Sequence, residues 1–359
     1  MSGQAPPEPA PPPRLTTLSH GGGCGCKIAP GVLEQILRNT PALPVPEALM
    51  VDISTADDAA VYRLNEGQAL VATTDFFMPI VDDPHDFGRI AATNAISDVY
   101  AMGGRPILAL AVVGMPLQQL GTGVISRILE GGGAACRAAG IPIAGGHTIE
   151  SLEPIYGLVA LGLVNPDRVR RNSDARPGDR LVLGKGLGVG VLAAALRQER
   201  LDARGYAGLL TSTTTLNEAG TALAEIDGVH AMTDVTGFGL VGHGLEMARG
   251  SGQRLRIHWP SVPLLEQARE LAGAGFITGA SARNWSACGG SVELPMGFAE
   301  VERALLCDPQ TSGGLLVSCA PEAVADVLGI FHRHGCPLAA EIGGVEPWSS
   351  GPQLVLDEG

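Results

Sequence analysis

The sequence predicts an α+β protein built from two domains. Stretches typical of strands and of helices both occur along the chain, without the strict strand-helix-strand repeat of a doubly wound sheet. At 359 residues, 45% of them hydrophobic, the chain is longer than one ordinary compact unit. Polar breaks at residues 165–167 and 176–179 separate two apolar halves. We therefore expect an N-terminal domain over residues 49–168 and a C-terminal domain over residues 175–352.

Two segments precede the first domain. Residues 1–13 read MSGQAPPEPAPPP and predict a solvated polyproline tail, since they have neither the basic start nor the apolar centre of a secretion signal. Residues 14–48 are expected to form a mobile lid and linker, because they contain the glycine-rich sequence HGGGCGCK at residues 20–27. A short helix is expected at residues 32–37, ended by the proline-containing stretch at residues 41–46.

The N-terminal domain is expected to contain both strands and helices. Extended segments at residues 59–62 and 68–75 flank Asn65-Glu66-Gly67 and predict a hairpin. A helix over residues 86–102 is expected to start at an aspartate cap and to end at Gly103-Gly104. The elements expected after it are a strand at 106–115, a helix at 124–139, a strand at 141–144 that ends in the turn Gly145-Gly146-His147-Thr148, and a strand at 156–164.

The C-terminal domain is expected to begin with a strand at residues 181–183. Residues 233–239, TDVTGFG, are expected to open a helix that runs to Met247. Near the end, the polar sequence CDPQTSGG at residues 307–314 leads into a strand at 315–318, and a helix follows at 322–334.

Charge and cysteine content restrict the classes of function. The formal charge of −13 argues against nucleic acid as a partner, because phosphate backbones are bound by clustered Lys and Arg. Seven cysteines, of which only one pair is close in sequence, indicate a protein of the reducing cytoplasm without a disulfide framework. The longest apolar stretches, such as residues 106–117, are too short to cross a bilayer. We therefore expect neither a nucleic-acid nor a membrane partner.

Aspartates recur at the ends of apolar strands and inside a helix, where an unpaired charge is unfavourable. Hard oxygen ligands of this kind suit Mg²⁺, which often shares phosphate oxygens with a nucleotide. Asn94 and Asp98 also project from one helical face, beside small residues that leave room for a ligand. Turns and helix caps favour aspartate as well, so the residues alone leave both interpretations open. The aspartates concerned are Asp57, Asp58, Asp75, Asp98 and Asp234.

The glycine-rich segment at residues 20–27 supports several kinds of chemistry. Lys27, three residues after Cys24, could lower the pKa of that thiol or bind a phosphate. Cys24 and Cys26 could instead form a metal clip with His20, or a redox pair, although a closed zinc site needs a fourth ligand. The segment is not a Walker A loop, since Cys26 stands where that loop requires glycine. The other cysteines are expected to be inert core residues: Cys136, Cys288, Cys307, Cys319 and Cys336.

Taken together, these motifs resemble the selenophosphate synthetase family. The resemblance runs from Arg14 to the last expected strands. It rests on the ordered sequences SHGGGCGCK (19–27), DDAAVY (57–62), TTDFFMPIV (73–81), FGRIAATNAISD (87–98), AGGH (144–147), TDVTGFG (233–239) and DPQTSGG (308–314). The resemblance implies a fold like that of aminoimidazole ribonucleotide synthetase, in which N-terminal strands of two chains form a shared barrel in a homodimer. It also implies that ATP lies in a cleft between the domains.

The resemblance further implies an enzyme that converts ATP, selenide and water into selenophosphate, AMP and phosphate. Such an enzyme supplies activated selenium for selenocysteine and selenouridine synthesis. It would use ATP as a substrate and Mg²⁺ as a cofactor, and a protein that delivers selenium is a possible partner. Two alternatives stay open: a small-molecule kinase of the thiamine monophosphate kinase type, which would release ADP, and a non-enzymatic selenium or metal carrier that uses Cys24 and Cys26.

The same resemblance assigns roles to individual residues. Cys24 takes the position of the family's catalytic cysteine or selenocysteine, and Lys27 that of a catalytic lysine in contact with ATP. The expected Mg²⁺ ligands are Asp58, Asp98 and Asp234. The expected nucleotide contacts are Lys27, Thr55, Ala56, Asp57, Asp75, Asp98, Gly146, His147 and Thr148.

Overall fold

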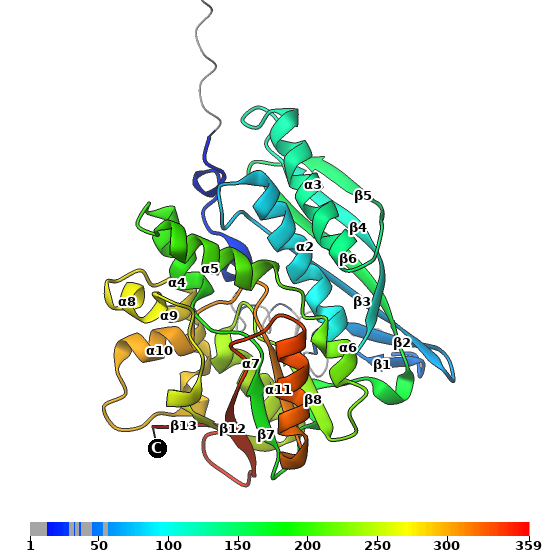
Figure 1. Ribbon diagram of the computed structural model, residues 1–359, viewed down its shortest axis with the longest axis vertical. Coiled ribbons are helices and arrows are strands. Elements are labelled where there is room, and N and C mark those ends of the chain that lie inside the picture. The colour runs from blue at the N-terminus through cyan, green and yellow to red at the C-terminus, as the bar shows by residue number, and fades with distance from the viewer. Residues whose placement is uncertain (1–12, 29–31, 33–35, 37–44, 53–56, 359) are drawn as a thin grey trace, which may run out of the picture.

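The computed structural model describes residues 13–28, 32, 36, 45–52 and 57–358, and two β-sheets organise this part of the chain (Figure 1). The tail at residues 1–12, most of the helix expected at 32–37, and the expected nucleotide contacts Thr55 and Ala56 lie outside the described residues.

The first sheet is formed by the N-terminal half of the chain. Its strands are β1 (Leu49–Val51), β2 (Ala60–Asn65), β3 (Gln68–Phe77), β4 (Arg105–Met115), β5 (Ile143–Glu150) and β6 (Ile155–Val164). Their order is β1-β2-β3-β6-β4-β5, with β4 and β5 parallel and the other neighbours antiparallel. The hairpin predicted around residues 65–67 is confirmed by the antiparallel pairing of β2 with β3.

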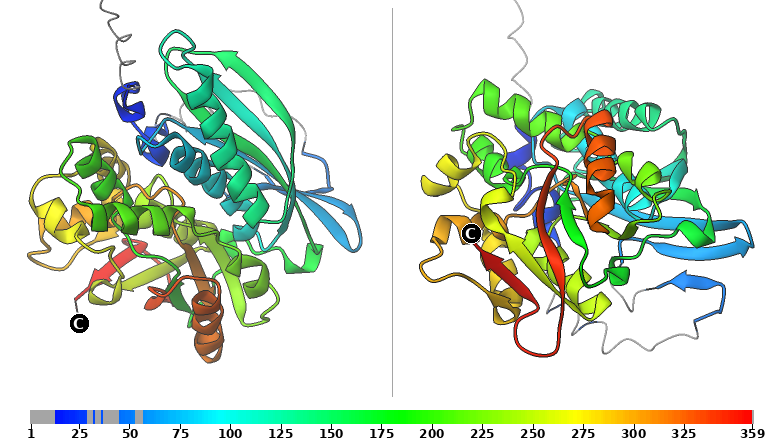
Figure 2. Two further views of the ribbon diagram at one scale, coloured as in Figure 1. Left: turned by 45° about the horizontal axis from the view of Figure 1, so that its top comes forward. Right: turned by 60° about the horizontal axis from the view of Figure 1, so that its bottom comes forward.

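Helices α2 (Pro84–Ala101) and α3 (Thr122–Ala138) cover one face of this sheet, as Figure 2 shows. The predicted cap of α2 is placed one turn too late, because the carboxylate of Asp83 accepts a hydrogen bond from the Asp86 N–H at 2.9 Å. The two helices pack with little space between them. A Cβ atom on Gly88 would lie 1.9 Å from the Ile128 carbonyl oxygen, so this approach requires a glycine.

The turn predicted at residues 145–148 is wrong. Strand β5 continues through these residues to Glu150, paired in parallel with β4. The glycines serve strand pairing instead of a turn: a Cβ on Gly146 would lie 2.1 Å from the carbonyl oxygen of Ala111. Gly146, His147 and Thr148 therefore lie exposed on an edge strand of the first sheet.

The second sheet is formed by the C-terminal half. Its strands are β7 (Arg180–Leu183), β8 (Val229–Asp234), β9 (Gln253–His258), β10 (Val292–Glu293), β11 (Leu315–Cys319), β12 (Ala340–Pro347) and β13 (Leu354–Asp357), in the order β10-β13-β9-β12-β7-β11-β8. The predicted strands at 181–183 and 315–318 are confirmed as β7 and β11. The last strand, β13, lies beyond residue 352.

Helices connect and cover these strands. They are α4 (Val189–Arg197), α5 (Ala203–Thr214), α6 (Ala219–Leu223), α7 (Gly239–Ser251), α8 (Ala268–Gly273), α9 (Gly279–Cys288), α10 (Glu300–Leu306) and α11 (Val324–Arg333). Short 3₁₀ turns are η1 (Leu15–Thr17), η2 (Gly23–Cys26), η3 (Pro166–Arg168), η4 (Asn172–Asp174), η5 (Trp259–Ser261), η6 (Gly289–Ser291) and η7 (Pro321–Ala323). The helix predicted after residues 233–239 is confirmed as α7, and none of the described helices combines the length and apolarity needed to cross a membrane.

One apolar cluster joins the two halves of the chain. It contains side chains of α2 and of α7, and also Leu15 and Cys24 from the N-terminal segment, each only 1% exposed. This segment is packed between the two halves (Figure 2). The expected lid is therefore part of the core in this structure, and the residues that it approaches form the candidate active site.

Candidate active site

Three carboxylates converge where the two sheets meet. Asp58 precedes β2, Asp98 lies on α2 and Asp234 ends β8, and one oxygen of each lies within 4.8 Å of the others. Burial, and then the negative charge of Asp234, raise the pKa of Asp58 and of Asp98 well above the ordinary value. One oxygen of Asp58, Oδ2, is buried without a hydrogen-bond partner among the described residues. A crowded and partly buried set of carboxylate oxygens fits a bound Mg²⁺.

Each of these carboxylates accepts a hydrogen bond from a hydroxyl group. Thr73 donates to Asp98 at 2.5 Å, Ser97 to Asp234 at 2.5 Å, and Thr233 to Asp58 at 2.9 Å. Neither Ser97 nor Thr233 donates to the carboxylate of the aspartate that follows it in the sequence. Each donates instead to the carboxylate of an aspartate on another element. Ser97 thereby links α2 to β8, and Thr233 links β8 to the segment before β2. Sequence reasoning missed all three hydroxyls, although each stands inside a quoted motif.

Cys24 lies on η2, beside this cluster. Its backbone N–H donates to the Thr311 hydroxyl at 3.1 Å, and its Sγ donates to Oδ1 of Asn94 at 3.1 Å. Burial, followed by the negative charge of Asp75, raises the pKa of the Cys24 thiol well above its usual value, although Lys27 acts in the opposite direction. Burial therefore outweighs the expected effect of Lys27 on this pKa and favours the protonated form of the Cys24 thiol.

Lys27 connects the cysteine segment to the acidic side of the site. Its Nζ lies 3.7 Å from Oδ2 of Asp75, and Asn94 Nδ2 donates to the same oxygen at 2.5 Å. The Lys27 side chain is 39% exposed, and its partial desolvation by itself would lower the pKa. The charges of Asp75 and other acidic groups raise the pKa above the ordinary value, so the ammonium stays charged. A Cβ on Gly237 would lie 2.6 Å from the Cys24 carbonyl oxygen, so a glycine is needed where the segment meets the residues before α7.

Several contacts hold the segment from outside. Arg14 forms an ion pair with Asp82 at 2.7 Å, and the His20 ring lies 3.0 Å from a Glu153 carboxylate oxygen. His20 is thus paired with an acidic residue. Among the described residues, neither Cys24 nor another cysteine belongs to a cluster of metal-ligating side chains, and the structure gives no support to the metal clip considered above.

Residues 308–314 form the opposite wall of the site. Ser312 adopts a left-handed conformation with φ 51°, and its N–H donates to Asn94 Oδ1 at 2.7 Å. The buried Lys185 supports this loop, since its Nζ donates to the carbonyl oxygens of Ser312 at 2.8 Å and of Thr215 at 2.7 Å. Lys185 and Thr311 were not predicted. Thr311 could have been found from the sequence because it lies in the DPQTSGG motif. Lys185 lies in no such motif, and only the fold brings it to the loop.

The structure does not bring all the predicted site residues together. Cys24, Lys27, Asp75 and the three clustered carboxylates share one region, whereas Asp57 accepts a hydrogen bond from the Asn172 N–H at 2.7 Å and stands outside the cluster. Residues 146–148 are separated from β3 by strands β6 and β4, which corresponds to roughly 14 Å at the usual spacing of strands. The five cysteines expected in the core are buried, as predicted.

Comparison with known proteins agrees with this architecture. Residues 56–164 match the family described as "AIR synthase related protein, N-terminal domain", and residues 176–351 match the corresponding C-terminal domain. Among solved structures, a thiamine-monophosphate kinase from Stenotrophomonas maltophilia is 19% identical with a TM-score of 0.62, covering 91% of this chain and 95% of that one. Hydrogenase maturation protein HypE in complex with ATP is 21% identical with a TM-score of 0.65, covering 87% and 86%. Fold and site thus define an AIR synthase-related protein.

Relatives with much higher sequence identity assign the chain to one family within this class. "Selenide, water dikinase" from Burkholderia pseudomallei is 64% identical over 331 residues, which is 92% of this chain and 94% of that protein. The protein of the same name from Dechloromonas aromatica is 60% identical over 330 residues, covering 92% and 95%. The chain belongs to the selenide, water dikinase family.

Proposed function

We propose that this protein is a selenophosphate synthetase that converts ATP, selenide and water into selenophosphate, AMP and phosphate. The observation that carries the proposal is the position of a buried thiol, Cys24, next to a cluster of three carboxylates, with the ion pair of Lys27 and Asp75 beside it. A simple kinase of this fold needs the carboxylates but has no use for a cysteine placed there. The 64% identity to a selenide, water dikinase supports the same activity.

The carboxylates of Asp58, Asp98 and Asp234 would hold Mg²⁺. When bound there, Mg²⁺ would supply positive charge to offset the negative charge that develops during phosphoryl transfer. Ser97, Thr73 and Thr233 orient these carboxylates by the hydrogen bonds described above.

Lys27 and Asn94 act on the cysteine side of the site. The Lys27 ammonium, kept charged by Asp75, offers a positive group to the transferred phosphoryl group. Asn94 fixes the direction of the Cys24 thiol through Oδ1. Selenide is a strong nucleophile that needs little activation, and burial favours the protonated form of the Cys24 thiol. We therefore assign to Cys24 the guidance or holding of selenium and not a role as a base.

The nucleotide would lie between a domain at residues 49–168 and one at 175–352, with residues 14–48 as the lid. Contacts to it are assigned to Lys27, Thr55, Ala56, Asp57, Asp75 and Asp98 by the family resemblance. The five core thiols favour a cytoplasmic enzyme, because reduced cysteines persist in that compartment.

We also propose a homodimer, which the first sheet supports. Helices cover one face of this sheet, while its other face presents exposed apolar side chains, among them Tyr62 (42% exposed) and Phe76 (50%). Pairing two such faces would bury them in a shared barrel. Residues 146–148 lie too far across their own sheet to reach the acidic cluster directly, so in a dimer they would contact the nucleotide of the second copy.

The role of Cys24 is tested by replacing it with serine. In Cys24→Ser we expect selenophosphate formation from ATP and selenide to fall by about 100-fold or more, the size of effect typical of a misplaced reacting group. Cys136→Ser, which alters a buried thiol on α3, is the matched control and should stay within a few-fold of the unaltered protein. Full selenophosphate output from Cys24→Ser would refute the assignment.

A further inference from the structure

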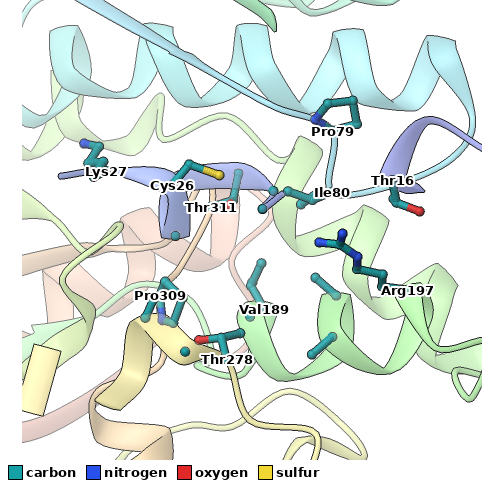
Figure 3. Close-up of a pocket in the computed structure, with 18 of the residues that line it drawn as sticks. Thr16, Cys26, Lys27, Pro79, Ile80, Val189, Arg197, Thr278, Pro309 and Thr311 are labelled. Atoms are coloured by element: carbon teal, nitrogen blue, oxygen red, sulfur yellow. The ribbon is translucent and has the colours of Figure 1, made fainter. Parts of the chain in front are cut away.

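A cavity of about 480 Å³ opens on the side of the cysteine segment that faces α4 and α9 (Figure 3). Its walls come from residues 16–27, from the loop between β3 and α2, from helix α4, from residues 278–283 at the start of α9, and from residues 309–311. Arg197 of α4 and Arg283 of α9 both line it, and we call it the arginine pocket. Nothing in the chemistry described so far uses this space.

The arginine pocket is positively charged in an acidic protein. Lys27, Arg197 and Arg283 belong to its described lining, and no acidic residue does, whereas the whole chain carries a formal charge of −13. The guanidinium groups are anchored, because Arg197 donates to the Ser19 carbonyl at 2.7 Å and Arg283 to the Gly25 carbonyl at 3.0 Å. A cleft of one sign of charge concentrates ligands of the opposite sign, so the pocket is suited to an anion.

The pocket reaches the active site at the cysteine segment. Lys27 is among its lining residues, and the same ammonium lies 3.7 Å from Asp75 on the acidic side. Figure 3 shows the Cys26 sulfur and the Lys27 amine pointing in different directions from the same short segment. Cys24 stands between the two sides, since its thiol bonds to Asn94 and its N–H to Thr311, a residue of the pocket wall.

Charge separates the routes by which the two substrates can arrive. An anion that approached from the acidic side would meet Asp58, Asp98 and Asp234, together with the phosphates of ATP. From the arginine pocket it would meet only neutral or positive described side chains before it reaches Lys27. Small wall residues such as Ala193 and Ala280 leave space for a polarisable anion.

We propose that the arginine pocket binds the substrate hydroselenide anion before it meets the phosphate donor, so that selenide and ATP approach Cys24 from opposite sides. The inference rests on the proposed function, because hydroselenide is a ligand of interest only if selenide is the substrate. It assigns Arg197 and Arg283 as binding residues for selenide and gives them no part in binding the nucleotide.

A matched pair of substitutions tests the pocket without altering the arginines. Ala193→Glu and Ala193→Gln add side chains of nearly equal size to the pocket wall, but only the first adds a negative charge, which could also pair with Arg197 one turn later. We expect KM for selenide to be about tenfold higher in Ala193→Glu than in Ala193→Gln, as a like charge roughly 12 Å away would cause at an effective dielectric of about 20. KM for ATP should agree between the two. Equal KM values for selenide would overturn the proposal.

Two further measurements make the outcome specific. Ala203→Glu adds the same charge at the exposed start of α5 and should leave KM for selenide unchanged; an increase like that of Ala193→Glu would overturn the proposal in favour of an effect of net charge. If Ala193→Glu weakens inhibition by inorganic phosphate but not selenide use, the pocket holds phosphate and the proposal is wrong.

Direct binding separates this inference from the proposed function. Anaerobic calorimetry with hydroselenide and without ATP should show about tenfold weaker binding to Ala193→Glu than to Ala193→Gln, from the same charge repulsion. A chain that forms no AMP from ATP and selenide would refute the proposed function, whatever the calorimetry shows. A chain that does form AMP but binds hydroselenide equally in both variants would refute only the pocket.

Discussion

The thiol of Cys24 donates a hydrogen bond to Oδ1 of Asn94 across 3.1 Å, and this contact joins the N-terminal segment to helix α2. The same amide group donates through Nδ2 to Asp75, the carboxylate that faces Lys27. Asn94 is buried and also accepts from the Ser312 N–H. One side chain thus sets the positions of the thiol, of the lysine's partner and of the loop opposite.

Replacing Asn94 with aspartate should disable the site while keeping its shape. The carboxylate introduced by Asn94→Asp cannot donate to Asp75 and would place a second negative charge against it, so we expect kcat for selenophosphate formation to fall about 100-fold. Asn65→Asp, at the exposed hairpin turn, is the control for the charge change. Steady-state kinetics measure the effect, and a thermal melt checks that the variant is folded. A folded Asn94→Asp with kcat within a few-fold of the unaltered protein would contradict this account.

The three-carboxylate cluster predicts a metal-dependent gain in stability. In EDTA, Asp58→Asn should be at least as stable as the unaltered protein, because it relieves repulsion within the cluster. With Mg²⁺ at about 100 times its dissociation constant, the unaltered protein should gain roughly 2.7 kcal/mol and Asp58→Asn much less. Denaturant titrations with and without Mg²⁺ measure this difference. Asp167→Asn, an exposed control, should behave like the unaltered protein, and an equal gain in Asp58→Asn would exclude Asp58 as a ligand.

Asp308 predicts how stability changes with pH. This buried carboxylate accepts from the Gly190 N–H at 2.9 Å at the start of α4, and burial raises its pKa to about 7. Because the pKa is higher in the folded than in the unfolded chain, its contribution to stability is complete below about pH 4 and is lost as the pH rises through 7. Relative to Asp308→Asn, the unaltered protein should therefore lose up to roughly 4 kcal/mol between these limits. Chemical denaturation of both proteins across this range measures the difference, and a pH-independent difference would contradict the assignment.

The open face of the first sheet predicts the assembly state. Phe76 on β3 is 50% exposed in the single chain, and a glutamate there would place a charge in the proposed interface. Light scattering should show a dimer for the unaltered protein and mostly monomer for Phe76→Glu. Leu117→Glu, at a residue 55% exposed outside the strands, should stay dimeric. If light scattering shows that the unaltered protein is a monomer, the proposed dimer is wrong.

Much of the fold could be predicted from local patterns. The hairpin of β2 and β3, helix α7 and strand β11 follow from apolar periodicity and from turn residues. The predicted start of α2 is wrong because several aspartates stand near it, and only the hydrogen bond from the Asp86 N–H identifies Asp83 as the cap. The turn predicted at residues 145–148 is wrong because a glycine pair has the same appearance in a turn and in two closely paired strands.

The candidate site was predictable in its residue types but not in its connections. Asp58, Asp98 and Asp234 could be selected as carboxylates in apolar surroundings, and the structure does bring them together. The hydrogen bonds from Ser97 to Asp234 and from Thr233 to Asp58 join elements that are far apart in the sequence, so local patterns do not predict them. The same holds for Lys185 beneath Ser312 and for the arginine pocket, whose walls come from five separate parts of the chain.

The most direct test of the central claim is the fate of ATP when selenide is supplied under anaerobic conditions with Mg²⁺. The account predicts that AMP, phosphate and a compound with a selenium-phosphorus bond form together in equal amounts and only when selenide is present, as phosphorus NMR would show. Release of ADP in place of AMP, or of AMP that does not depend on selenide, would contradict it.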